Sequence, residues 1–284
     1  MSEHTNPEDL VLVVGGTGKS GRRVAERLDA VGLPVRRASR SSAIPFDWED
    51  PSTWAPVLEG ATKAYVSYYP DLAFPGATEQ IRGFAELAVA AGVRHLVLLS
   101  GRGEPEAVAS EKVVQDAGAD WTVVRCDWFA QNFSEGFLLD PVLAGMLALP
   151  AGDVGVPFVD LDDVADIATA ALTRPGHAGE LYEVTGPRLL TFADAAAELS
   201  AASGREIRYL PVTSEQFAEV LTGVGLPPEH AAALNDLFAE ILDGRNANLA
   251  DGVQRALGRE PKDFTAYARA AAATGVWAAI GQEG

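Results

Sequence analysis

The sequence predicts an α/β protein, with a doubly wound parallel sheet and a smaller, mainly helical C-terminal domain. Two observations indicate this class. Short apolar runs rich in β-branched residues alternate with segments of helical periodicity through the first half of the chain. A glycine-rich loop directly follows the first of these runs. With 284 residues and 48% hydrophobic content, the chain can bury a core of the size that this architecture needs.

The expected strands follow one another along the first half. Residues 10–14 are continuously apolar, as in a strand that is buried on both faces. Val24, Leu28 and Val31 then share one helical face, and Gly32 suits the end of that helix. The same reasoning places strands at 34–37, 43–46, 64–67, 96–100 and 121–125, and helices over 79–91 and around 107–117.

The glycine-rich loop predicts a dinucleotide site. It fits G-x-G-x-x-G from its second residue and G-x-x-G-x-x-G from its first, and it comprises Gly15, Gly16, Thr17, Gly18, Lys19, Ser20 and Gly21. Because it links an apolar strand to an amphipathic helix, the loop is placed to bind the pyrophosphate of NAD(P). A tight turn that binds nothing is the alternative. A P-loop is excluded, since it needs a glycine where Val13 stands.

The end of the second strand favours NADP(H) over NAD(H). An acidic side chain about 20 residues past the glycines would bind the ribose 2′-hydroxyl of NAD, but residues 36–41 contain no acid. Arg40, with Arg37 and Arg22, would instead bind a 2′-phosphate through charge-assisted hydrogen bonds. A solvated arginine face at the end of a strand is the alternative interpretation.

After about residue 135 the pattern changes to alanine-rich helices separated by glycine and proline. Two segments return to the strand-and-helix pattern of the first half, with a strand at 157–160 before a helix over 162–172, and a strand at 180–185. We therefore expect residues 9–135 with 155–186 to form the dinucleotide-binding Rossmann domain. Residues 136–154 with 187–284 would form the smaller helical domain, which would cap the carboxyl edge of the sheet and shape a substrate site.

Further segments resemble the atypical short-chain dehydrogenases/reductases, specifically their NmrA-like branch. The resemblance covers nearly the whole chain, in order and spacing, through residues 13–18 with Gly21, 46–48, 98–101, 121–125, 128–133 and 157–165. It implies that Asp47 and Trp48 lie beside the adenine, and that Ser67 and Tyr68 follow the cofactor. It also implies that Ser100, Cys126, Asp127 and Trp128 lie near the nicotinamide and the substrate. Asp47 starting a turn, Trp128 and Phe129 in the core, and Ser100 capping a helix are the alternatives.

The chain departs from reductases that protonate an alkoxide through Tyr-x-x-x-Lys. No tyrosine lies between Ser100 and Trp121, and Val108 stands four residues before Lys112. The histidine that the family usually has four residues before Glu111 is replaced by Ala107. No dedicated proton donor is visible, so Tyr68, Ser100 or a bound water are the candidates.

Two functions fit this pattern. The first is an NADPH-dependent reductase of a small quinone-, enone-, imine- or azo-like substrate, whose delocalised product anion needs little acid catalysis. Its pocket would be lined by Tyr68, Tyr69, Trp128, Phe129, Phe133 and Phe137. The second is a nonenzymatic NADP(H)-binding redox sensor that acts through a protein partner, as the resemblance implies for some members. A cofactor-free module on the same fold is a third, disfavoured class.

Composition excludes some classes of binding partner. The net charge of −18 disfavours nucleic acid and anionic membranes as partners. We expect a cytoplasmic protein, because residues 1–9 lack the features of a secretory signal and no apolar run approaches the roughly 18 residues that span a bilayer. We expect residues 1–9 to form a short disordered tail. One cysteine and four scattered histidines predict no metal. A homodimer is one candidate for the assembly of the chain.

Overall fold

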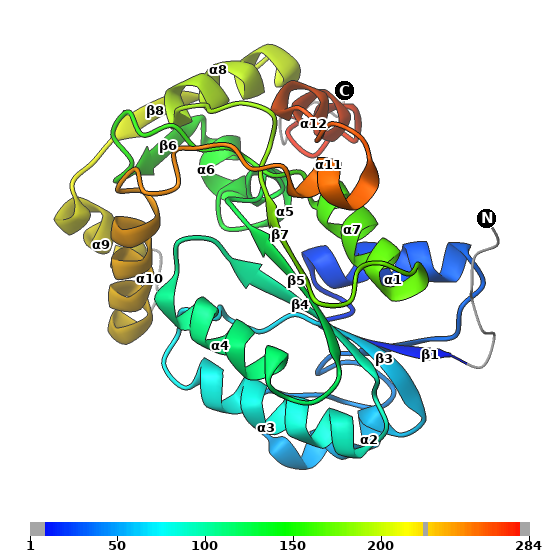
Figure 1. Cartoon of the computed structure of the whole chain (residues 1–284). Helices are drawn as coiled ribbons and strands as arrows, with labels where there is room; N and C mark the ends of the chain where they lie inside the picture. The colour runs from blue at the N-terminus through cyan, green and yellow to red at the C-terminus, as the bar shows by residue number, and fades with distance from the viewer. Residues whose placement is uncertain (1–8, 224–226, 279–284) are drawn as a thin grey trace. The chain divides into compact units, whose positions relative to one another are not determined.

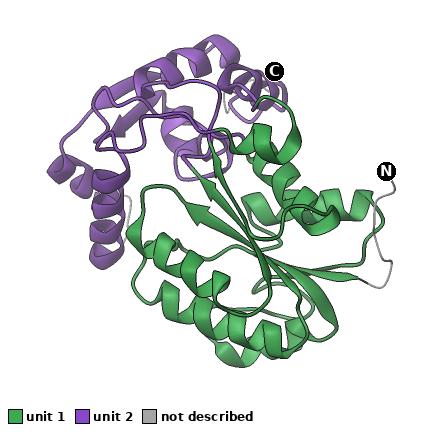
Figure 2. Cartoon of the chain, in the orientation of Figure 1, with its two compact units in different colours: residues 1–126, 161–184, 251–260 green, residues 127–160, 185–250, 261–284 purple. Residues whose placement is uncertain are grey.

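The computed structural model describes residues 9–223 and 227–278, so residues 1–8 of the expected N-terminal tail lie outside them. Asp9, the last residue of that expected tail, is instead buried and pairs with Lys63 at 3.4 Å and Arg94 at 2.8 Å. The chain divides into two compact units (Figure 2). Unit 1 comprises residues 1–126, 161–184 and 251–260, and unit 2 comprises 127–160, 185–250 and 261–284. Relative to the expected domains, residues 127–135, 155–160 and 185–186 fall in unit 2, and 251–260 fall in unit 1.

Unit 1 is a six-stranded parallel sheet with helices on both faces (Figure 1). The strands run in the order β2-β1-β3-β4-β5-β7, so the direction of strand addition reverses at β1. This confirms the predicted doubly wound class. The strands are β1 (Leu10–Val14), β2 (Val35–Ala38), β3 (Ala61–Val66), β4 (His95–Gly101), β5 (Asp120–Cys126) and β7 (Glu180–Val184).

The helices of unit 1 cover the sheet in two layers. One layer contains α1 (Lys19–Ala30) and α7 (Leu161–Thr173), and the other contains α2 (Trp54–Leu58), α3 (Ala77–Ala90) and α4 (Pro105–Gln115), with the short 3-10 helix η1 (Pro51–Thr53) before α2. Alternate residues of β1 show why both faces are buried. Leu12 and Val14 pack in the cluster under α2, α3 and α4, and Val11 and Val13 are equally buried on the opposite face.

Helix α11 (Gly252–Leu257) belongs to unit 1 although it comes late in the chain. Gly252 lies against β7, where a Cβ would sit 2.1 Å from the carbonyl oxygen of Glu183. Past the helix, Arg259 pairs with the buried Asp163 at 2.7 Å and with Asp166 at 2.6 Å. Asp166 also binds Arg27 of α1 at 2.6 Å. These contacts explain why the segment returns to the sheet unit.

Two predicted strands are absent. Residues 43–46 form only an isolated bridge between Ser39 and Pro45, because proline has no N–H with which to continue a ladder. Residues 157–160 likewise form no strand and lie in unit 2, where Val159 makes an isolated bridge to Phe129. The segment is held by two hydrogen bonds to the chain around Phe129: Ala130 N–H donates to Val159 O, and Val159 N–H donates to Trp128 O, both at 2.8 Å.

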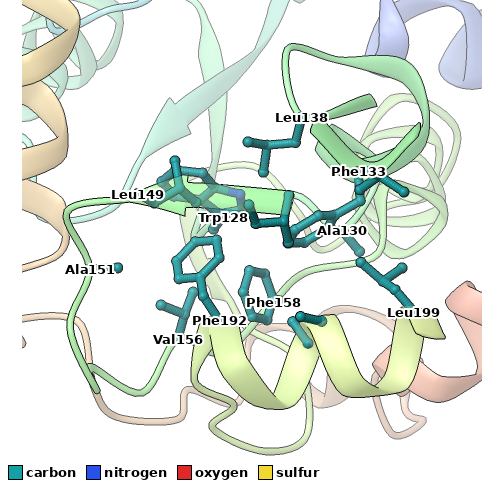
Figure 3. Packing of buried hydrophobic residues seen from close by; sticks show 14 of the residues in the cluster. Trp128, Ala130, Phe133, Leu138, Leu149, Ala151, Val156, Phe158, Phe192 and Leu199 are labelled. Atoms are coloured by element: carbon teal, nitrogen blue, oxygen red, sulfur yellow. The ribbon is translucent and has the colours of Figure 1, made fainter. Parts of the chain in front are cut away.

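Unit 2 is mainly helical and contains a two-stranded parallel sheet that the sequence did not predict. Its core is aromatic: Trp128, Phe133, Phe158 and Phe192 gather in one buried cluster (Figure 3). The elements are α5 (Asn132–Glu135), α6 (Leu139–Ala144), β6 (Met146–Leu149), α8 (Phe192–Ser203), β8 (Arg208–Pro211), α9 (Ser214–Gly223), α10 (Pro228–Ile241) and α12 (Phe264–Ala273).

Within residues 9–223 and 227–278, none of the helices has the length and apolar character required to span a bilayer. The same residues contain no group of His, Cys, Asp or Glu side chains arranged to hold a metal ion.

Candidate functional site

The carboxyl ends of β1 to β5 bring the sequence-predicted residues of unit 1 to one edge of the sheet. After β1 the chain turns tightly: Gly15 and Gly16 donate their N–H groups to Ala38 O at 3.0 and 3.1 Å, and Gly18 N–H donates to Gly15 O at 2.8 Å. Gly15 has φ +73°, which favours glycine. The loop therefore holds its backbone in a fixed arc at the edge where ligands of such sheets bind.

Helix α1 begins at this loop. No side chain caps its N-terminus, and its first turn contains no acidic residue. Gly21 lies so close to the loop that a Cβ would be 2.2 Å from Gly15 O, so only glycine fits. An uncapped helix N-terminus behind a close-packed glycine loop suits a pyrophosphate, whose charge interacts favourably with the helix dipole and backbone N–H groups.

The arginines near the end of β2 differ in their surroundings. Arg37 forms an ion pair with Asp29, and Arg36 donates to the carbonyl oxygens of Val57 and Glu59 at 2.8 and 2.6 Å. Arg40 is exposed, and its guanidinium lies over the ring of Tyr69 at 5.4 Å. Arg40 has no acidic partner among the residues that the structure describes. Arg22, the third predicted arginine, is half-buried on α1.

Asp47 and Trp48 form part of the framework of unit 1. The Asp47 side chain accepts the N–H of Glu49 at 3.1 Å, and its carbonyl oxygen accepts from the indole of Trp54 at 2.8 Å. Trp48 is buried against Phe46, Trp54, Phe84 and Tyr68. Its indole N–H donates to Ser67 O at 3.3 Å. This tryptophan therefore fastens the chain after β3 to the turn that starts at Asp47.

Three predicted residues follow β3. Ser67 lies beside the glycine loop, since a Cβ on Gly15 would be 3.3 Å from Ser67 Cβ. Tyr68 donates its hydroxyl to Gln80 Oε1 at 2.7 Å, and burial raises its pKa. Its proton is therefore retained at neutral pH and already bonded within the protein. Tyr69 is 66% exposed.

Ser100, near the end of β4, belongs to a buried polar network. Its hydroxyl donates to Glu111 Oε1 at 2.6 Å, and Arg125 Nε donates to the same oxygen at 2.8 Å. The Glu111 hydrogen bond raises the pKa of Arg125, so this guanidinium stays charged. Cys126, at the end of β5, is buried, and its thiol donates to Val124 O at 3.6 Å.

Sequence reasoning assigned no role to Glu111 and missed Asp71 and Glu104. The Asp71 side chain accepts the N–H of Ala73 at 3.0 Å and hydrogen bonds with Glu104. Burial raises the pKa of the Asp71 carboxyl. The Glu104 carboxylate lies against Gly101, where a Cβ would be 2.2 Å from both of its oxygens. The signal was available, since both acids closely follow adjacent strands, β3 and β4.

The other predicted substrate residues lie in unit 2. Asp127 accepts the N–H of Trp128 at 2.8 Å, and the Trp128 ring stacks on Phe238 at 5.0 Å. Phe129 is half-buried, and Phe137 is 47% exposed and lies 6.1 Å from Trp128. Phe133 is fully buried against Phe158, Phe192 and Phe264, so it belongs to the core of this unit (Figure 3).

Comparison with known proteins gives relatives above 30% identity over nearly the whole chain. The chain is 34% identical over 292 residues to the NAD(P)H azoreductase of Xenophilus azovorans, and the match covers 93% of this chain and 98% of the relative. No protein-family model matches the chain.

Solved structures show the same fold. The NADPH-dependent quinone oxidoreductase of Escherichia coli in complex with NADPH has a TM-score of 0.76 and 23% identity, over 91% of this chain and 98% of that one. NmrA, a negative transcriptional regulator in complex with NAD, has a TM-score of 0.69 and 17% identity, over 93% of this chain and 95% of that one.

Proposed function

Because the chain belongs to the NmrA-like branch of the atypical short-chain dehydrogenases/reductases, we propose that it is an NADPH-dependent reductase of a small organic substrate. The observation that carries the proposal is the glycine loop. Gly15 and Gly21 are in close contact, which leaves no room for a side chain at Gly21, and no side chain caps the N-terminus of the helix that follows. The similarity to an NAD(P)H azoreductase along nearly the full length of both chains supports the same function.

The residues present fit a dinucleotide. The loop supplies backbone N–H groups for the pyrophosphate, and α1 adds the positive end of its dipole. The adenosine would lie toward β2 and the nicotinamide toward β3, β4 and β5, on either side of the reversal in strand order at β1. When bound, the reduced nicotinamide supplies a hydride.

We assign the preference for NADPH over NADH chiefly to Arg40. It is exposed at the end of β2 and is not neutralised by an acid among the described residues, whereas Arg37 is paired with Asp29. A 2′-phosphate would therefore form charge-assisted hydrogen bonds mainly with Arg40. Arg22 and Arg37 would add favourable charge nearby.

The substrate class follows from the side chains near the nicotinamide half. Tyr68 is protonated but bonded to Gln80, and no tyrosine lies between Ser100 and Trp121. A substrate whose reduced form is a delocalised anion does not need a strong acid in the rate-limiting step. We therefore propose azo, quinone, imine or enone compounds. We also propose that the exposed ring of Tyr69, which follows β3, contacts the substrate.

The test is turnover. Purified protein is mixed with NADPH and a panel of azo dyes, quinones, imines and enones, and the absorbance of the reduced nicotinamide is followed. The proposal predicts oxidation of NADPH that depends on both protein and acceptor. It also predicts that Gly21→Ala, which disturbs the loop, loses this activity while Gly223→Ala retains it, because a Cβ at Gly223 meets no atom within 4 Å.

A nonenzymatic redox sensor is the second candidate, favoured by the similarity to NmrA in complex with NAD. It predicts tight nucleotide binding with no turnover of any acceptor, and affinities that differ strongly between NADP⁺ and NADPH. Titration calorimetry with both nucleotides, on the protein preparation used for the turnover assay, separates the two functions.

A further inference from the structure

A buried carboxylate controls the direction of the Ser100 hydroxyl. Glu111 on α4 is 2% exposed, and its two oxygens accept hydrogen bonds from Nε and Nη2 of Arg125. Arg125 also donates to Glu183 Oε1 at 2.9 Å. The Glu111 carboxylate thus forms a two-point ion pair with this guanidinium, and a carboxylate can only accept hydrogen bonds.

The hydroxyl of Ser100 must therefore be the donor in its 2.6 Å hydrogen bond to Glu111 Oε1. A serine hydroxyl carries one proton, so Ser100 has none to donate to a ligand. No other hydrogen bond to this side chain occurs in the part of the chain that the structure describes. Its remaining lone pair can accept one, at a place that is 4% exposed and so shielded from water.

This inference rests on the proposed function. We propose that Ser100 is a hydrogen-bond acceptor for the carboxamide N–H of the nicotinamide, and that Glu111 is the positioning residue that imposes this direction. The carboxamide carries an NH₂ donor and a carbonyl acceptor, and a side chain that can only accept selects the NH₂. The bond would fix the rotation of the ring, and thereby the face from which hydride leaves. Ser100 then supplies no proton to the substrate.

The experiment compares two nucleotides that differ at this group. Titration calorimetry measures the affinities of NADP⁺ and of its 3-acetylpyridine analogue, in which a methyl group replaces the NH₂. The ratio of the two affinities is compared among the wild type, Ser100→Ala and Glu111→Gln. Ser110→Ala is the matched control, because Ser110 is a buried serine of the same helix as Glu111 that contacts Thr78 at 3.1 Å and not Ser100.

We expect the wild type and Ser110→Ala to bind NADP⁺ about three- to tenfold more tightly than the analogue, as one neutral hydrogen bond allows. Ser100→Ala should bind both alike. Glu111→Gln should lower the ratio, since an amide can donate to Ser100 and free its proton for the acetyl oxygen. A purely structural role of Glu111 would leave the ratio of the two affinities unchanged, so a change in this ratio tests the assigned role.

Two outcomes overturn the inference: equal affinities in the wild type, or a ratio in Ser100→Ala that equals the wild-type ratio. In both, nucleotide binding itself persists and the proposed function stands. Failure of the wild type to bind either nucleotide contradicts the proposed function as well, so the two failures are distinguishable. Ser100→Ala removes a single oxygen, and its thermal unfolding midpoint checks that it is folded.

Discussion

Replacing Gly21 by alanine has two opposing effects on stability, and the size of each is known. Helix propensity alone favours alanine over glycine by about 1 kcal/mol. Packing opposes it, because the new Cβ would lie 2.2 Å from the carbonyl oxygen and 2.7 Å from the carbonyl carbon of Gly15. Both are backbone atoms, so the loop must move by about 1 Å to restore ordinary van der Waals separation. Overpacking of this kind costs about 1–3 kcal/mol, so we expect the clash to outweigh the propensity gain.

Urea unfolding and calorimetric titration with NADPH measure both consequences. We expect the free energy of unfolding of Gly21→Ala to fall by about 1 kcal/mol, and its affinity for NADPH to fall about tenfold or more, since about 1.4 kcal/mol corresponds to tenfold. The control Gly223→Ala, at the end of α9, adds a Cβ in open space, so its stability should not fall and its affinity for NADPH should not change. A Gly21→Ala protein with wild-type stability and wild-type affinity would refute the packing argument and, with it, the structural basis for the loop as a phosphate cradle.

Four further predictions follow from named contacts. Arg40→Asp should lower the affinity for NADPH about tenfold or more while leaving that for NADH nearly unchanged, as measured by calorimetry. Arg259→Met leaves Asp163, 1% exposed, without its 2.7 Å cation and should lower the free energy of unfolding in urea by about 2 kcal/mol; an unchanged unfolding curve would contradict this. Burial lowers the pKa of His95 to about 4 from its usual 6.5, so its contribution to stability is present above pH 6.5 and is lost as the pH falls toward 4. Thermal melting of His95→Gln should show less loss across that interval. Burial raises the pKa of Asp71, which penalises its ionised form at neutral pH; Asp71→Asn should therefore melt at a higher temperature than the wild type at pH 7, and at a closer temperature near pH 4.

The parts of the fold that depend on residues close together in the sequence were predictable. The apolar run of β1, the glycine spacing after it and the helical face of Val24 and Leu28 are local signals, and the structure forms β1 and α1 from them. The prediction of a strand at 43–46 was wrong because it relied on the apolar residues and neglected Pro45. Proline has no N–H, so it prevents regular strand pairing there.

The hydrogen-bond partners in the site were not predictable from spacing. Ser100 could be placed at the end of a strand, but its donor role depends on Glu111, which is held by Arg125 from the next strand. Likewise, the sequence analysis assigned Arg40, with Arg37 and Arg22, to the 2′-phosphate, but it could not show that Arg37 forms an ion pair with Asp29. Such roles depend on contacts between residues that are distant in sequence, and one sequence carries no direct signal for them.

The central claim is that the backbone after β1 holds the pyrophosphate of a nicotinamide nucleotide. Isothermal titration of the folded wild type with NADPH and NADH tests it most directly. We predict saturable binding of both, with one nucleotide per chain and NADPH bound about tenfold more tightly. Absence of any binding heat with either nucleotide at several temperatures, in protein that melts cooperatively, would contradict the claim.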